Sequence, residues 1–186
     1  MKEIIRIIYK ENNEKNYKEG KMEIWDAYYR DGRKANCDLI RGEKVPKGFY
    51  HLVAEVLVKH VDGSYLLMQR DLNKETFPGK YEASAGGSCL KGETPIEGAF
   101  RELKEETGIT ATSLEEIYHI VNDENQRIYY GYLSIVDCDK DSIILQEGET
   151  ISYKWMKEEE FLELVNSDEY AGAHGKRLKE YLDNIK

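Results

Sequence analysis

Apolar residues along this chain occur in short runs bounded by turn residues, a pattern that predicts strands more often than helices. Residues 51–61 are rich in Val and Leu, Asp62-Gly63 is a turn dipeptide, and residues 64–70 alternate in polarity, so this stretch predicts a β-hairpin. Further strands are expected at 81–85, 115–121, 127–136 and 150–156, and helices at 158–165 and about 175–185. Many strands, few helices and a mixed order indicate an α/β (α+β) fold with a mixed sheet.

The N-terminal part of the chain divides into segments of different character. Residues 1–10 carry four isoleucines, residues 11–21 are polar, and residues 22–29 resemble a strand. The predicted division is a leader at 1–21, an N-terminal strand and connection at 22–48, and the main domain at 49–186. Clustered isoleucines favour burial in a strand, either at an edge of their own sheet or against a partner, so we hypothesise a homodimer that uses the leader.

One helix carries unusually clear signals at both ends. Thr94 is a good N-cap, Pro95 suits the first helical position, and Glu97 completes a capping box, while Gly108 provides a stop. The helix is therefore expected from Pro95 to Thr107. Two stripes share its surface: an apolar one at Ile96, Ala99, Phe100 and Leu103, and an acidic one at Glu102, Glu105 and Glu106.

The acidic stripe has two interpretations. It can be a solvated face, relieved in part by Arg101 and Lys104, because like charges at this spacing destabilise a helix. However, it adjoins the apolar stripe and follows the Gly86-Gly87 segment, expected as a loop, whose backbone can approach a ligand closely. Clustered carboxylates are the hard oxygen ligands that Mg²⁺ or Mn²⁺ requires, so the stripe is also a candidate metal site.

Composition and charge limit the partners. The chain has 186 residues and a formal net charge of −9, which disfavours nucleic acid as a ligand and calls for a divalent cation beside any anionic one. No run approaches the ~20 apolar residues of a membrane helix, and charges interrupt the apolar N-terminal run, which argues against a signal peptide. Three widely spaced cysteines indicate reduced thiols, so we expect a cytoplasmic protein without membrane association.

The segment from Gly87 to Ile109 resembles the box motif of the Nudix hydrolase family. Nine fixed positions over 23 residues match: Gly87, Glu93, Arg101, Glu102, Leu103, Glu105, Glu106, Gly108 and Ile109. The resemblance implies an α/β/α sandwich with a mixed sheet, and a catalytic centre formed by Arg101 and the three acids of the stripe. Glu102, Glu105, Glu106 and the backbone carbonyl near Gly87 would bind Mg²⁺ or Mn²⁺. Glu93 would pair with Arg101 as structural support.

The reaction implied by the resemblance is hydrolysis of a diphosphate linkage in a small molecule. Metal ions would neutralise the phosphate oxygens and lower the pKa of an attacking water, while a carboxylate takes its proton. Candidates for this base are Glu102, Glu124 and Glu149, and the last two can equally be ordinary loop acids.

The flanks of the box are similar to those of type I isopentenyl diphosphate isomerases, at residues 23–26, 50–52 and 77–81. An isomerase would need a catalytic Cys and a metal-binding His where this chain has Gly86 and Ser88, and Cys89 is three residues too late. His51 matches one isomerase metal position and can equally be a structural histidine. Because the box is intact, we expect a hydrolase; a diphosphate isomerase and a non-catalytic nucleotide-binding domain are the alternatives.

Substrate identity rests on weaker signals. Arg70 and Lys74 match positions that bind diphosphate in the isomerase-like subgroup, although they can be ordinary surface charges, and Arg127 is a further candidate. On the strand 127–136, Tyr129 faces one side, while Tyr130 and Tyr132 face the other. The tyrosine rings of one side can stack on a nucleobase, or they can pack in the protein core. We expect a nucleoside diphosphate or a derivative.

Overall fold

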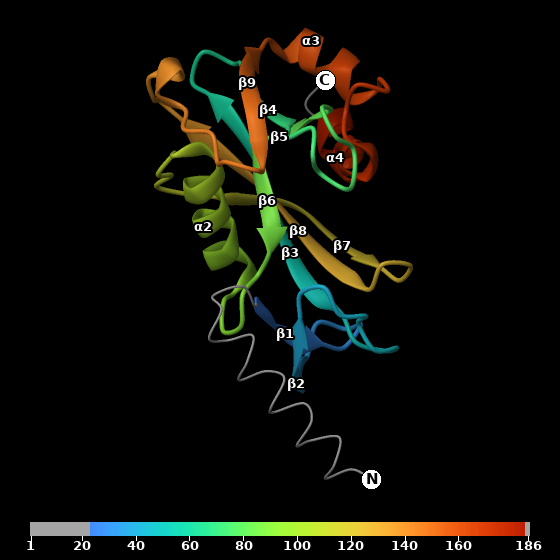
Figure 1. Ribbon diagram of the computed structural model, residues 1–186. Helices are drawn as coiled ribbons and strands as arrows, with labels where there is room; N and C mark the ends of the chain where they lie inside the picture. Colours follow the sequence, from blue (N-terminus) through green and yellow to red (C-terminus); the bar gives the residue numbers. More distant parts are fainter. Residues whose placement is uncertain (1–22, 185–186) are drawn as a thin grey trace, which may run out of the picture.

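A computed structural model describes residues 23–184 of the chain; the predicted leader at 1–21 lies outside the described residues (Figure 1). A central sheet of seven strands is covered by α2 on one face and by α3 and α4 on the other, and a separate two-stranded sheet lies at one end. The prediction of a mixed α/β sandwich is confirmed. The central strands are β3 (His51–His60), β4 (Tyr65–Arg70), β5 (Tyr81–Ala83), β6 (Ala85–Ser88), β7 (Glu115–Asn122), β8 (Arg127–Val136) and β9 (Thr150–Met156). The helices are α2 (Pro95–Thr107), α3 (Glu158–Val165) and α4 (Gly172–Asn184), with a 3₁₀ turn, η1, at Lys140–Ser142.

The sheet order is β5-β4-β3-β8-β7, with β6 also paired to β3 and β9 to β4. Only the β3–β8 pair is parallel among the strand pairs of residues 23–184. The expected hairpin is present, since β3 and β4 are antiparallel and Gly63 takes the left-handed conformation, with φ 91°. None of the helices within the described part of the chain has the length and apolar character needed to cross a membrane.

Side-chain alternation along the central strands produces a core on each face of the sheet. On β3, residues Leu52, Ala54, Val56 and Val58 pack with Ala99 and Leu103 of α2, whereas Val53 and Leu57 pack with Phe161 of α3 and Leu178 of α4. This two-sided burial explains why residues 51–58 are almost continuously apolar in the sequence.

Helix α2 has the predicted bounds. Thr94 and Glu97 form the capping box, and Gly108 ends the helix with φ 77° while its N–H donates to the carbonyl of Lys104. The prediction for Ile96 was wrong: 40% of this side chain is exposed. Three of the four buried residues of α2 follow the i, i+4 row 99, 103 and 107, the fourth being Gly98, and Ile96 lies to one side of that row.

Three local predictions need correction. A strand β2 (Lys34–Ile40), which pairs with β1 (Ile24–Tyr28), was not expected, because much of it is polar and exposed. Gly86 and Gly87, expected in a loop, lie in β6, where the backbone of β3 pairs with them. The single strand expected at 81–85 is divided at Ser84, whose hydroxyl accepts from Val58 N–H and donates to the carbonyl of Leu66, each at 2.9 Å. In addition, α4 begins at Gly172, a few residues before the expected start.

Candidate active site

One long cleft connects the acidic side of α2 with the first turns of α4. Its volume is about 990 Å³, and its wall includes the glycines of β6, the segment between β4 and β5, and the start of β8. Every box residue predicted to bind metal, together with Arg70 and Lys74, lines this cleft. The fold therefore brings together residues that are spread over more than 100 positions of the sequence.

Arg101 binds carboxylates on several sides at once. Its Nε and Nη2 donate to the two carboxylate oxygens of Glu93, at 2.7 and 3.0 Å, and its Nη1 donates to Glu102 at 2.7 Å and Glu105 at 3.0 Å. Nη2 also donates to the carbonyl oxygen of Ser88 at 3.1 Å. These bonds tie the segment before α2 to the helix, which is the geometry expected of a supporting ion pair.

Glu106 is the box carboxylate that has no cationic partner among residues 23–184. It accepts a hydrogen bond from the backbone N–H of Gly86 at 3.1 Å. Burial raises the pKa of Glu106 well above its ordinary value, and the carboxylates of Glu102, Glu82 and Glu149 raise it further. Burial also raises the pKa of Glu102, although Arg101 opposes the shift. The site thus holds more negative charge than its own cations neutralise.

The two glycines of β6 leave space beside these acids. A Cβ atom on Gly87 would collide with the carboxylate of Glu102, and a Cβ on Gly86 would lie 3.1 Å from the carbonyl oxygen of Ala54. No three His, Cys, Asp or Glu side chains within the described residues are grouped as a ready metal site, and Arg101 already engages two of the three acids predicted to bind metal, Glu102 and Glu105. The donor set is nevertheless oxygen-only, anionic and short of cations, so its chemistry fits Mg²⁺ or Mn²⁺.

Arg70 and Lys74 line the cleft, but each is paired with an acid. Nη1 of Arg70 donates to both carboxylate oxygens of Glu82 at 2.7 Å, and Lys74 forms an ion pair with Glu149. Burial raises the pKa of Glu82, an effect that Arg70 opposes. Sequence reasoning missed Glu82, which lies outside the box, and the only signal for it is an acid within an otherwise uncharged short strand.

The two candidates for the general base outside the box differ in their position relative to the cleft. Glu149 lines the cleft and acts electrostatically on Glu106, whereas Glu124 is exposed in the turn between β7 and β8 and does not line the cleft. The tyrosines of β8 face the predicted sides: Tyr132 is buried in the core under α2, and Tyr129 is buried on the opposite face, where it lines the cleft.

A second group of polar residues forms the end of the cleft near α4. Nε of Arg177 donates to Glu55 at 2.7 Å, a second guanidinium bond engages the other oxygen of this carboxylate, and Tyr118 donates its hydroxyl hydrogen to Glu55 at 2.5 Å. The guanidinium carbon of Arg177 lies 3.9 Å from the ring centroid of Tyr129. Sequence reasoning missed this group; its one signal is Glu55, a charge in the middle of an apolar strand.

His51 is a core residue and does not line the cleft. It is 2% exposed and stacks on Trp25 with 4.3 Å between ring centroids. Burial lowers the pKa of His51 to about 4, and Arg127 contributes to the shift, so the ring is neutral at pH 7. Neither ring nitrogen has a hydrogen-bond partner among residues 23–184.

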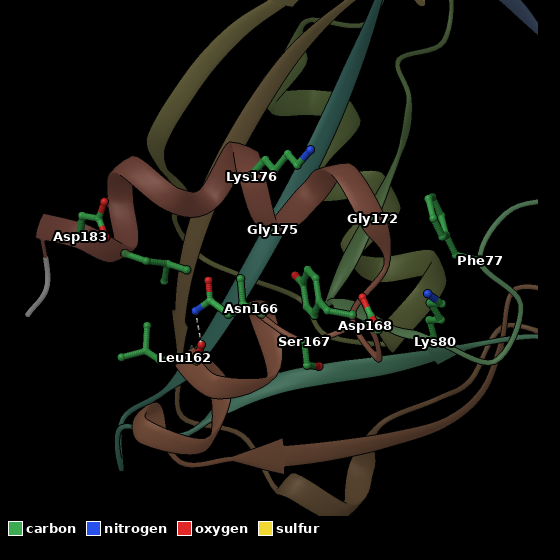
Figure 2. A pocket seen from close by; sticks show the side chains of 13 residues that line it. Phe77, Lys80, Leu162, Asn166, Ser167, Asp168, Gly172, Gly175, Lys176 and Asp183 are labelled. Carbon is green, nitrogen blue, oxygen red and sulfur yellow. Dashed lines mark hydrogen bonds between the residues drawn. The ribbon is translucent and has the colours of Figure 1, made fainter.

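A separate cavity of about 500 Å³ lies between α3, α4 and the segment before β5 (Figure 2). Figure 2 shows Lys176 and Gly175 on α4, and Phe77 and Lys80 on the segment before β5. Phe77 lines both this cavity and the long cleft, so its side chain forms part of the wall between them.

Sequence comparisons agree with the class of enzyme that this α/β/α fold and acidic cleft define. A family model described as NUDIX domain matches residues 49–178. An uncharacterised Nudix hydrolase from Listeria monocytogenes is 32% identical over 153 residues, which cover 80% of this chain and 88% of the relative. One from Pseudomonas aeruginosa is 30% identical over 147 residues, which cover 78% of this chain and 85% of the relative. The chain belongs to the Nudix family and is a Nudix hydrolase.

More distant comparisons concern the fold and the isomerase resemblance. A crystal structure from Deinococcus radiodurans superposes with a TM-score of 0.71 at 18% identity and covers 85% of this chain and 98% of its own. A MutT protein from Methanosarcina mazei superposes with a TM-score of 0.58 at 25% identity and covers 74% of this chain and 96% of its own. An isopentenyl-diphosphate Delta-isomerase from Corynebacterium diphtheriae is 28% identical over 130 residues, which cover 65% of this chain and 71% of the relative.

Proposed function

We propose that this Nudix hydrolase cleaves a diphosphate linkage in a nucleoside diphosphate or a derivative of one, with a divalent cation as cofactor. The observation that carries the proposal is the group of carboxylates around Glu106, which lie partly buried beside two glycines and lack sufficient countercharge. An anionic substrate could not enter such a site alone, because the charges would repel.

The residues suited to hold Mg²⁺ or Mn²⁺ are Glu102, Glu105 and Glu106, together with the backbone carbonyl near Gly87. When bound, the cation would neutralise phosphate oxygens and lower the pKa of a coordinated water. Arg101 supports the proposal in a different way, because its bonds to Glu93, Glu102 and Glu105 fix the direction of these side chains.

The remaining chemistry belongs to side chains at the edge of the acidic group. Glu149 is the favoured acceptor for the proton of the attacking water, since it lines the cleft and its charge acts on Glu106. Arg70 and Lys74 are the proposed ligands of the phosphate oxygens, because both line the cleft; they would exchange Glu82 and Glu149 for the substrate as partners.

Isomerase chemistry is disfavoured by the side chains present. Gly86 has no group that can transfer a proton, and Ser88 has no imidazole for a metal. Cys89 is no substitute, because it is buried and its burial raises the pKa of the thiol to about 12. The isomerase alternative therefore lacks the proton-transferring thiol and the metal-binding imidazole that it requires.

The direct test is a panel of nucleoside diphosphates and their derivatives incubated with the full chain and Mg²⁺ or Mn²⁺, with released phosphate and nucleoside monophosphate as the readouts. We expect cation-dependent turnover that falls at least about 100-fold in Glu149→Gln. Glu124→Gln is the matched control, because it removes the same charge in an exposed turn outside the cleft. Cation binding without cleavage of any compound would favour the non-catalytic alternative.

A further inference from the structure

We propose that Arg177 of α4, stacked on Tyr129, forms the surface that binds the planar base of the substrate, and that it determines specificity for nucleotides over simple diphosphates. This inference rests on the proposed function, and it concerns the part of the cleft that α4 forms beside the box. It gives the C-terminal helix a direct part in substrate selection.

The guanidinium of Arg177 is held in a fixed orientation. Two of its nitrogens bind the two oxygens of Glu55, and Tyr118 donates a hydrogen bond of 2.5 Å to the same carboxylate. Only 12% of the Arg177 side chain and 13% of the Glu55 side chain are exposed. A bidentate pair of this kind fixes the plane of the guanidinium as well as its position, so little flexibility is lost when a ligand binds.

One face of this plane is already covered. The guanidinium carbon lies 3.9 Å from the centroid of the Tyr129 ring, and the ring itself is 3% exposed. Tyr129 is therefore not free to stack on a ligand. Arg177 also lines the cleft, so the surface available to a ligand here is the part of the guanidinium that Tyr129 and Glu55 leave uncovered. Arginine planes stack on nucleobases much as aromatic rings do.

Arg177 and the Tyr129 ring beneath it, here called the platform, lie close to the box acids, of which Glu106 is the nearest along β6. Gly86 separates them: its N–H donates to Glu106, and a Cβ placed on it would lie 3.3 Å from Cγ of Glu55. A ligand whose phosphates lie against the box can therefore place its other end over Arg177. Asn125 and Arg127 also line this part of the cleft and bond to the hydroxyl of Tyr129, at 2.9 and 3.4 Å, so polar groups surround the platform.

Arg177 is poorly suited to be another phosphate ligand. Glu55 neutralises it through two hydrogen bonds, and only 13% of the Glu55 side chain is exposed, against 27% of the Glu82 side chain that pairs with Arg70. Replacing Glu55 by a phosphate would therefore leave the more deeply buried of the two carboxylates without its cation. A planar heterocycle does not require Arg177 to leave Glu55, because it can stack on the neutralised guanidinium.

The test compares two kinds of diphosphate in the same enzyme. With the wild-type chain and Mg²⁺, kcat and KM are measured for nucleoside diphosphates and for methyl diphosphate, which has no ring. We expect Arg177→Ala to raise KM for the nucleoside diphosphates about 10- to 100-fold, the range of one stacked base. The kcat/KM for methyl diphosphate should stay within about twofold.

Matched variants separate recognition from folding. Lys176→Ala removes the neighbouring positive charge of α4, which lines the other cavity and not the cleft, and should leave turnover of both substrates unaffected. Because Arg177→Ala leaves Glu55 buried and unpaired, the double variant Glu55→Gln with Arg177→Gln repeats the test without a buried charge. It should show the same selective loss for nucleoside diphosphates.

The outcomes are distinct. An equal loss for both kinds of substrate in both Arg177 variants would overturn the inference and leave the proposed function standing. Wild-type turnover limited to ring-free diphosphates would overturn both the inference and the nucleoside part of the proposed function, and only cation-dependent diphosphate hydrolysis would stand. Calorimetric binding of nucleoside monophosphates is measured in parallel without metal. Binding that depends on Arg177, together with no cleavage of any diphosphate, would support the platform and refute the hydrolytic proposal.

Discussion

Replacing Glu106 by Gln is expected to stabilise the metal-free protein while it removes activity. Gln keeps the volume and the oxygen that accepts the Gly86 N–H, but it has no charge. Glu102, Glu82 and Glu149 are the three like charges that act on Glu106. At about 0.2–0.5 kcal/mol for each repulsion, the variant should gain about 1 kcal/mol, which is about 2–4 °C in melting temperature for a domain of this size.

The gain should depend on pH in a defined direction. Because the pKa of Glu106 is raised in the folded state, the folded protein loses stability as the pH rises from about 4.5 through that raised value. The difference between Glu106→Gln and wild type should therefore be small near pH 4.5 and largest at pH 8. Thermal melts in EDTA across this range measure it, with Glu105→Gln as the matched control, since Glu105 is 48% exposed and paired with Arg101.

Added cation should reverse the order of stability. At 100 times its Kd, Mg²⁺ would stabilise the wild type by about 2.7 kcal/mol, and a 10- to 100-fold weaker affinity in Glu106→Gln would leave about 0.4–1.4 kcal/mol. Turnover should fall at least about 100-fold. A metal-free Glu106→Gln variant that is less stable than wild type at pH 8 would show that the Glu106 carboxylate stabilises the fold. An unchanged shift with Mg²⁺ would remove Glu106 from the metal site.

Four further outcomes follow from the same geometry. Arg101→Ala should lower the free energy of unfolding by about 2–3 kcal/mol in urea titrations, since two half-buried acids lose their cation; a loss below 0.5 kcal/mol would contradict this. Gly87→Ala should reduce turnover at least about tenfold, with a melting temperature within a few degrees of wild type, because the displaced Glu102 carboxylate is flexible. Isopentenyl diphosphate should yield no allylic isomer by NMR, and cation-dependent conversion would overturn the assignment of Gly86 and Ser88. Deletion of residues 1–21 should convert a dimer to a monomer in light scattering with catalysis retained; two monomers of equal stability would refute the homodimer hypothesis.

The box could be predicted from the sequence because its signals are local. Thr94, Glu97 and Gly108 determine the ends of α2 by contacts within a few residues, and these contacts are present. The acids of the stripe share a helix, so their spacing alone places them together. Strand β2 was not predicted, because it is stabilised by pairing with β1 and has little apolar alternation of its own.

The platform could not be predicted, because it depends on tertiary contacts between distant segments. Arg177 and Glu55 are separated by 122 positions, and nothing near either residue specifies the other. Tyr129 was correctly placed on one side of β8, but the guanidinium that covers its ring comes from a helix that had no assigned role. Periodicity predicts which face a side chain occupies, whereas its partner depends on how the layers assemble.

Gly86 lies between the box acids and the Glu55–Arg177 pair. Because of this position, a catalytic cysteine at residue 86 would be incompatible with the present arrangement of Glu55 and Arg177. A Cβ at position 86 would lie 3.1 Å from the carbonyl oxygen of Ala54 and 3.3 Å from Cγ of Glu55, closer than most side chains tolerate. The cysteine that an isomerase needs at this position would therefore press on Glu55, which holds Arg177 over Tyr129, and on the backbone of β3. The same substitution would also alter the strand whose N–H binds Glu106. The glycine that removes the acid–base group is therefore also the residue that allows a carboxylate–guanidinium pair to form beside the box.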